Sequence, residues 1–91
     1  MHHENMDLQL RLALQSSGQR FTEQRAAVYR YLAGTDIHPT AEEVFLAVRS
    51  DLDGISLATV YKSLEALVGC DLAVKLNYSD SSARYDARMD P

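Results

Sequence analysis

Tyr61 and Lys62 stand side by side in a stretch of mainly apolar and small residues, SLATVYKSLEAL at positions 56–67. A lysine can donate to guanine O6 or N7 or to a phosphate, and a tyrosine can reach a phosphate or a thymine methyl group. On a helix, Ala58, Thr59 and Lys62 share a face opposite the apolar stripe, and Tyr61 lies at the edge of that stripe, where it could also be a half-buried core residue. Because two small residues and one cation can approach another molecule closely, this face favours docking. A core helix whose exposed side is merely small is the alternative.

Arg20 and Arg25 lie around a second predicted helix start, in the stretch GQRFTEQR at positions 18–25. Arginines near the first turn oppose the helix dipole, so helix stability does not explain them. A helix N-terminus with nearby guanidinium groups suits phosphate, and an arginine just outside the helix can enter a narrow minor groove. Solvated surface arginines are the alternative.

His38 and Asp86 can each bind a metal, but a metal site needs more donors than these two. A lone histidine before Pro39 is more often a turn residue. Cys70 is the only cysteine, so no disulfide within the chain and no Cys-x-x-Cys site can form. No nucleophile is paired with a base, and the sequence has no glycine-rich phosphate loop and no acid–base carboxylate pair. We therefore expect no enzyme.

Length and composition indicate one small soluble domain. The 91 residues suffice for a single core, and 46% of them are hydrophobic. Neither a signal peptide nor a membrane-spanning apolar run is found, so we expect a cytoplasmic protein with no membrane partner. The formal net charge of −4 argues mildly against nucleic acid, but the positive charge is concentrated. Between positions 11 and 30, a single acid, Glu23, stands against Arg11, Arg20, Arg25 and Arg30.

The first part of the chain predicts two helices. Residues 7–16 alternate apolar and polar residues as a strand does, but most are strong helix formers; Asp7 can cap the helix and Gly18 can end it. Thr22 is suited to cap a second helix that runs to about Ala33. Its buried face is expected to contain Val28, Tyr31 and Leu32.

Two further helices follow. Thr40 and Glu43 form a Thr-x-x-Glu capping box, which predicts the start of the third helix. Its inner stripe is expected to contain Ala41, Val44, Phe45, Val48 and Leu52. The stretch DLDG at 51–54 breaks this helix, and Ser56 can cap the fourth, which ends near Gly69. The apolar stripe of the fourth helix is expected to contain Leu57, Val60, Leu64, Leu67 and Val68.

After Cys70 the apolar period changes from that of a helix to two, which predicts a β-hairpin. The turn is SDSS at 79–82, and the second strand covers 83–87. One face of the first strand is expected to contain Leu72, Val74, Leu76 and Tyr78. The predicted fold class is therefore α+β, mainly α: a winged helix-turn-helix of four helices followed by a two-stranded wing, whose last helix enters the DNA major groove.

The segments GQRFTEQR, HPTAEEVF, ISLATVYKSLEAL and SSARYD, in this order and spacing, closely resemble the ferric uptake regulator (Fur) superfamily of metal-dependent bacterial repressors. The resemblance covers nearly the whole chain from Leu8. It implies a DNA-binding half joined to a C-terminal half that dimerises and binds metal, with dimers on A/T-rich palindromes. Residues 1–91 are then expected to be the winged-helix domain alone, without that C-terminal domain.

The resemblance also implies roles for individual residues. Tyr61 and Lys62 match the pair used in the major groove, and Arg20 matches the basic residue of the minor groove. His38 matches a regulatory metal ligand, and Asp86 an acidic ligand beside the hinge. The full set expected to bind DNA is Arg20, Thr22, Arg25, Ser56, Ala58, Thr59, Tyr61 and Lys62.

The ending SSARYD resembles the peroxide-sensing PerR branch more than the iron-sensing branch. A regulatory Fe²⁺, Mn²⁺ or Zn²⁺ is expected in a full-length homodimer, whereas this chain is expected to be mainly monomeric and to hold no metal tightly. The interpretation is thus the DNA-binding domain of a Fur-type repressor that controls metal homeostasis or the peroxide response. A winged-helix protein-interaction module without its own DNA target is the alternative, consistent with the acidic total charge.

Overall fold

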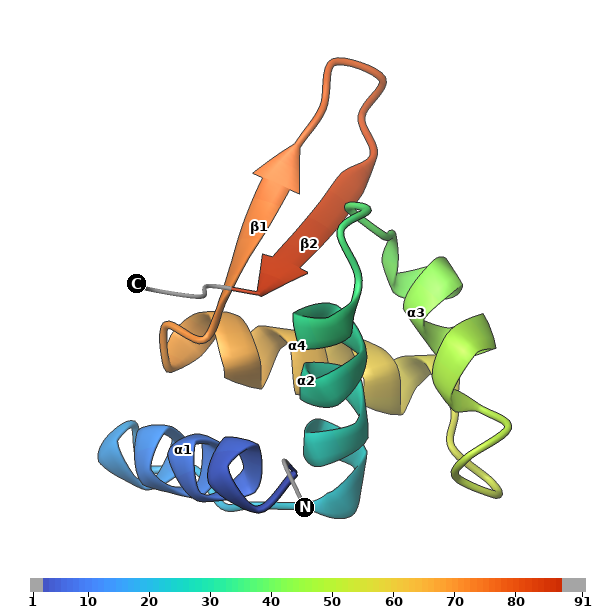
Figure 1. The fold of residues 1–91 in the computed structure, drawn as a ribbon. Helices are drawn as coiled ribbons and strands as arrows, with labels where there is room; N and C mark the ends of the chain where they lie inside the picture. The colour runs from blue at the N-terminus through green and yellow to red at the C-terminus, as the bar shows by residue number, and fades with distance from the viewer. Residues whose placement is uncertain (1–2, 88–91) are drawn as a thin grey trace.

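A computed structural model describes residues 3–87 and contains four helices followed by an antiparallel hairpin, which confirms the predicted winged-helix class (Figure 1). None of the helices it describes is long and apolar enough to cross a membrane. The elements are α1 (His3–Ser16), α2 (Glu23–Gly34), α3 (Ala41–Val48), α4 (Leu57–Gly69), β1 (Ala73–Asn77) and β2 (Ala83–Ala87).

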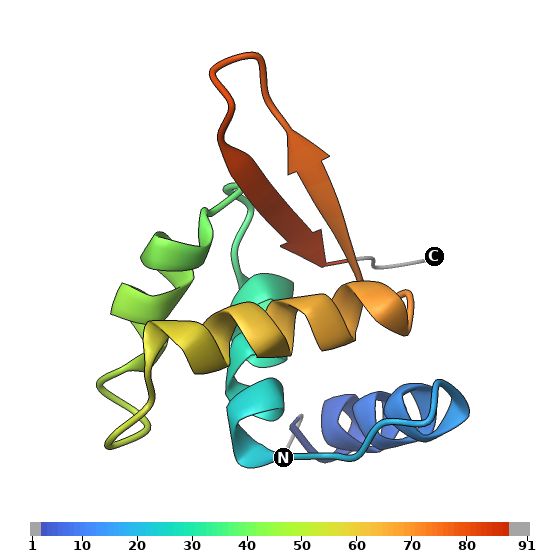
Figure 2. The ribbon, with the colours of Figure 1, turned by 180° about the vertical axis from the view of Figure 1, so that it is seen from behind.

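The core lies where α4 crosses α2, with α1 on one side and the wing projecting on the other (Figures 1 and 2). Helix α4 buries apolar residues at positions three and four apart, as a single helical face requires. Its side chains of Val60, Leu64 and Leu67 are fully buried. Removing one such leucine side chain typically costs about 2–5 kcal/mol. The orientation of α4 is therefore fixed by its buried face, which decides what its other face presents.

Three helix starts follow the sequence prediction. The hydroxyl of Thr22 accepts from the Arg25 amide at 3.1 Å, and that of Ser56 accepts from the Thr59 amide at 3.1 Å. Thr40 accepts from the Glu43 amide at 3.2 Å and donates its own amide to Glu43 at 2.9 Å, which completes the capping box.

The first helix differs from its prediction. It begins at His3, so Asp7 lies inside α1 and does not cap it. Its carboxylate instead accepts from Arg30 of α2, whose Nε lies 3.2 Å from Asp7 Oδ1, and whose second nitrogen binds Oδ2. This two-bond pair holds α1 against α2.

The buried faces of α2 and α3 also differ in part. In α2, Tyr29 is 2% exposed, whereas Tyr31 is only half-buried at the junction with α3. The buried arc of α2 is wide because α1, α3, α4 and β2 all contact it. Helix α3 ends at Val48, before Leu52, and its Phe45 is half-buried. In α4, Ser63 and Ala66 are buried as well, while Leu57 and Val68 are only partly covered.

The wing packs against the core with the strand face opposite to the predicted one. Ala73 pairs with Ala87 and Lys75 with Tyr85, and Tyr85 is 3% exposed. Because paired residues point to the same side, Val74 and Leu76 lie on the opposite face and are only half-buried. Two residues of the predicted strand lie outside it: Leu72, which is nonetheless buried, and Tyr78, which is exposed.

Candidate nucleic-acid interface

Helix α4 presents the predicted polar face to solvent. Ala58, Tyr61 and Lys62 are exposed, and Thr59 is half-buried beside the exposed cap Ser56. In Figure 2, α4 crosses in front of α2, and the wing stands above α4. Lys62 forms no hydrogen bond or ion pair with the described side chains of residues 5–87, so its ammonium group is available to an outside acceptor.

Tyr61 has a partner on the neighbouring helix. Its hydroxyl donates to Oε2 of Glu42, in the first turn of α3, at 3.1 Å. The hydrogen bond to this carboxylate, with some burial and the negative charge of Glu42, raises the pKa of Tyr61 above its usual value of 10.0. Tyr61 is still 39% exposed. It borders a shallow depression of about 280 Å³ that Ser81, Ser82 and Tyr85 of the wing also line.

The loop that carries Arg20 is held at three points. The Gln19 amide donates to the Leu14 carbonyl at 2.8 Å, at the end of α1. Arg25 donates from a guanidinium nitrogen to the carbonyl of Arg20 at 2.7 Å. The guanidinium of Arg11 lies 3.8 Å from the centroid of the Phe21 ring, a cation–π contact.

These contacts divide the predicted DNA-binding residues of this segment into those that bind other parts of the protein and those whose side chains are free within the described chain. Arg25 donates to the protein itself, and the Thr22 hydroxyl caps α2. The Arg20 side chain is exposed and makes no hydrogen bond or ion pair among the residues that the structure describes. The contribution of Arg11 was missed by the sequence reasoning, which treated it only as part of the basic segment.

His38, in the loop before α3, and Asp86, in β2, are both half-buried. We call the region where this loop meets β2 the root of the wing. The His38 carbonyl accepts from Arg84 at 3.0 Å, and the Pro39 carbonyl accepts from the Tyr85 amide at 2.9 Å, which ties this loop to β2. The Nδ1 atom of His38 is buried and has no hydrogen-bond partner in the part of the chain that is described. Among the side chains of residues 5–87, no three from His, Cys, Asp or Glu gather into a metal site.

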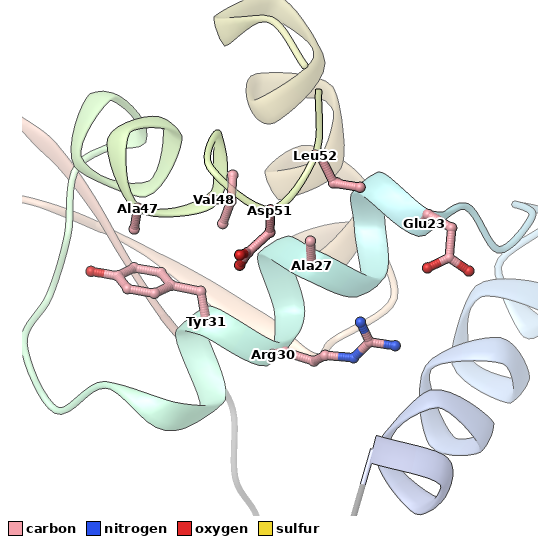
Figure 3. A pocket seen from close by; sticks show the side chains of 8 residues that line it. All are labelled: Glu23, Ala27, Arg30, Tyr31, Ala47, Val48, Asp51 and Leu52. Atoms are coloured by element: carbon pink, nitrogen blue, oxygen red, sulfur yellow. The ribbon is translucent and has the colours of Figure 1, made fainter. Parts of the chain in front are cut away.

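A larger hollow, of about 460 Å³, lies between α2 and the end of α3 and contains none of the predicted site residues (Figure 3). Tyr31 and Asp51 line it from opposite sides, while Arg30 points toward α1, where it binds Asp7. The volume of a hollow therefore does not locate the candidate site here.

The fold and the exposed α4 define a winged helix-turn-helix domain with its recognition helix in the open. Residues 16–90 match the Ferric uptake regulator family, and the chain belongs to that family. Its members are transcriptional regulators, which confirms the prediction that the chain is not an enzyme.

Similar proteins and solved structures agree with this family membership. The peroxide-responsive repressor PerR of Staphylococcus aureus (strain USA300) is 40% identical over 74 residues, which cover 81% of this chain and 50% of that protein. The ferric uptake regulator Fur of Helicobacter pylori superposes with a TM-score of 0.81 at 26% identity, over 93% of this chain and 57% of that one. PerR from Streptococcus pyogenes gives 0.74 at 30% identity, over 82% and 52%. The chain thus spans about half the length of these relatives.

Proposed function

We propose that this chain is the DNA-binding domain of a metal-dependent transcriptional repressor that acts in metal homeostasis or the peroxide response. The observation that supports it most is the open face of α4, where Tyr61 and Lys62 stand beside small residues on a helix fixed by its buried side. Such a face fits the major groove of an A/T-rich operator. The residues proposed to contact DNA are Arg20, Thr22, Arg25, Ser56, Ala58, Thr59, Tyr61 and Lys62.

The proposed roles follow from the contacts. Lys62 donates to a base edge or a phosphate, and Arg20 enters the minor groove from a loop that the protein already holds. The backbone of that loop is fixed before DNA arrives, so binding has to order only the arginine side chain. Thr22 and Arg25 also shape the loop, since both have partners within the chain.

For the whole protein we propose a homodimer with a further domain that binds a regulatory Fe²⁺, Mn²⁺ or Zn²⁺. One relative supports the regulatory metal: the H. pylori Fur is described with three functional metal-binding sites. The buried Nδ1 of His38, which has no hydrogen-bond partner among the described residues, fits a metal ligand, and Asp86 offers a carboxylate. A bound divalent cation would supply coordination bonds that join these residues to donors elsewhere in the protein.

A binding titration tests the DNA-binding role. Fluorescence anisotropy with an A/T-rich duplex at several salt concentrations should show binding by the parent that weakens as salt rises. Lys62→Ala should bind more weakly, and its salt dependence should fall by about one unit of slope if Lys62 contacts a phosphate. Lys75→Ala is the matched control, because it removes the same charge from an exposed lysine of β1. If the parent bound no duplex, the protein-interaction module would be favoured instead.

A further inference from the structure

The recognition face comprises the exposed side of α4 with Tyr61 and Lys62, and the loop that carries Arg20. We propose that Glu42 is a specificity-determining residue of this face, and that it acts by fixing the hydrogen-bond direction of Tyr61 and by repelling phosphates. This proposal rests on the proposed DNA-binding function. Glu42 belongs to α3, outside the set of residues expected to contact DNA, and its side chain is exposed. Its carboxylate accepts from the Tyr61 hydroxyl at 3.1 Å, across the junction of α3 and α4.

The direction of this hydrogen bond limits what Tyr61 can read. A phenol has one proton, and here that proton is directed at Glu42. Toward DNA the hydroxyl oxygen can then only accept. In the major groove, adenine N6 and cytosine N4 are donors, whereas guanine and thymine present acceptors. Glu42 therefore makes Tyr61 favour an amino group and disfavour guanine.

An A·T pair satisfies both ends of the tyrosine. Adenine supplies the amino donor for the hydroxyl oxygen, and the paired thymine supplies a methyl group for the ring edge. A tyrosine free to rotate its hydroxyl could donate to guanine as readily as it accepts from adenine. The pair of Glu42 and Tyr61 consequently selects adenine over guanine at one position of the site. Cytosine N4 can donate as well, but a G·C pair has no thymine methyl group for the ring edge.

The charge of Glu42 has a second effect. Binding to unrelated DNA depends almost entirely on phosphate contacts, so a carboxylate beside the recognition helix weakens it. Glu42 also lies in the first turn of α3, where a negative charge interacts favourably with the helix dipole and stabilises the helix. Helix stability does not require it to reach Tyr61, however, because the neighbouring Glu43 completes the capping box. Tyr61→Phe removes the hydrogen bond but leaves the Glu42 charge in the first turn of α3, so it separates the contact to Tyr61 from the effect on the helix dipole.

The test uses the 91-residue chain with a duplex library in which eight positions within an A/T-rich segment are randomised. Bound duplexes are sequenced, and the preference for adenine over guanine is read at each position. The parent should show a preference of about 5-fold to 150-fold at the position that Tyr61 reads. Glu42→Ala and Tyr61→Phe should each lose most of it, and the double variant should lose no more, since the two residues act as a unit.

The control Glu65→Ala removes an exposed acid one helical turn from Tyr61, without a hydrogen bond to it in the described chain. It should keep the preference for adenine over guanine. On an unrelated duplex, Glu42→Ala and Glu65→Ala should both bind about 2-fold to 5-fold more tightly because a like charge is gone. Tyr61→Phe should not.

A measurement without DNA examines the contact itself. The ultraviolet titration of the tyrosines, with Tyr61→Phe used to assign the signal, should show a lower pKa for Tyr61 in Glu42→Ala than in the parent. An unchanged preference for adenine over guanine in Glu42→Ala, or an unchanged Tyr61 pKa, would overturn this proposal while the DNA-binding role stood. Failure of the parent to bind any duplex would overturn both. Circular dichroism of each variant checks that the fold is intact.

Discussion

The recognition face and the root of the wing differ in how completely this chain builds them. On the recognition face, Arg20 sits in a loop held by Arg11 and Arg25, and Tyr61 is held by Glu42. At the root of the wing, the imidazole Nδ1 of His38 is buried without a partner among the described residues. We infer that the first site is preorganised, whereas the second offers donors that become useful only with others.

The largest expected effect concerns two copies of the preorganised face. If the isolated chain is monomeric, two copies bind the halves of a palindrome as separate events. Joining two copies by a flexible linker long enough to span both half-sites should raise affinity for the palindrome by about 10²–10⁴-fold, and leave affinity for a single half-site nearly unchanged. Anisotropy titrations on both duplexes measure this. Light scattering that found a stable dimer of the single chain at micromolar concentration would contradict the premise.

The next effect is on Arg20, the exposed arginine of the held loop. Arg20→Ala should weaken binding to an A/T-rich duplex by about 1–3 kcal/mol, because a narrow minor groove attracts an inserted arginine strongly. The loss should be smaller when the A/T-rich tract is replaced by a G·C-rich one with a wider groove. Arg49→Ala serves as control, since Arg49 is exposed at the end of α3. An equal loss on both duplexes would mean that Arg20 binds phosphate only.

A smaller effect is expected when the support of this loop is removed without a change in charge. Phe21→Leu deletes the ring under Arg11 and leaves every cation in place. A cation–π contact near the surface is worth about 0.5–1 kcal/mol, so DNA affinity should fall by about 2-fold to 5-fold. In combination with Arg20→Ala the loss should be less than the sum, because the ring acts through Arg20. Full additivity in the double-mutant cycle would show that the loop needs no such support.

The sequence predicted what depends on near neighbours in the chain. The caps at Thr22, Thr40 and Ser56 are bonds between residues three apart, and all three form. The bond between Tyr61 and Glu42 joins residues 19 apart, and that between Arg30 and Asp7 joins residues 23 apart. Such pairs depend on how helices cross, which local patterns do not contain.

The wing shows the same limit. Its alternation of residues was predicted, but period two does not say which face meets the core. That choice depends on Tyr85, whose amide binds the Pro39 carbonyl and whose side chain is buried. The exposure of Lys62 was predicted because a helical wheel separates an exposed face from a buried one without knowledge of the neighbours. Tyr61 lay at the edge of the predicted apolar stripe, where the wheel alone does not decide between burial and exposure.

The smallest effect is expected at the incomplete site. In the 91-residue chain, His38→Ala should change DNA affinity by less than about 2-fold, and it should change the free energy of unfolding by less than about 1 kcal/mol, because the imidazole Nδ1 loses no hydrogen bond. Calorimetry with Mn²⁺ or Zn²⁺ should find only weak binding to parent and variant alike, since two donors on separate elements do not hold such an ion tightly.

In a full-length protein the same substitution should abolish most metal-stimulated DNA binding, while basal contacts remain. A metal favours the DNA-competent arrangement only by binding it more tightly than the other arrangement, and His38 is the proposed ligand that gives this difference. Tight, stoichiometric metal binding by the 91-residue chain would contradict the contrast between the two regions. So would a full-length His38→Ala variant that responds to metal as its parent does, because the buried imidazole would then have no part in linking metal to DNA.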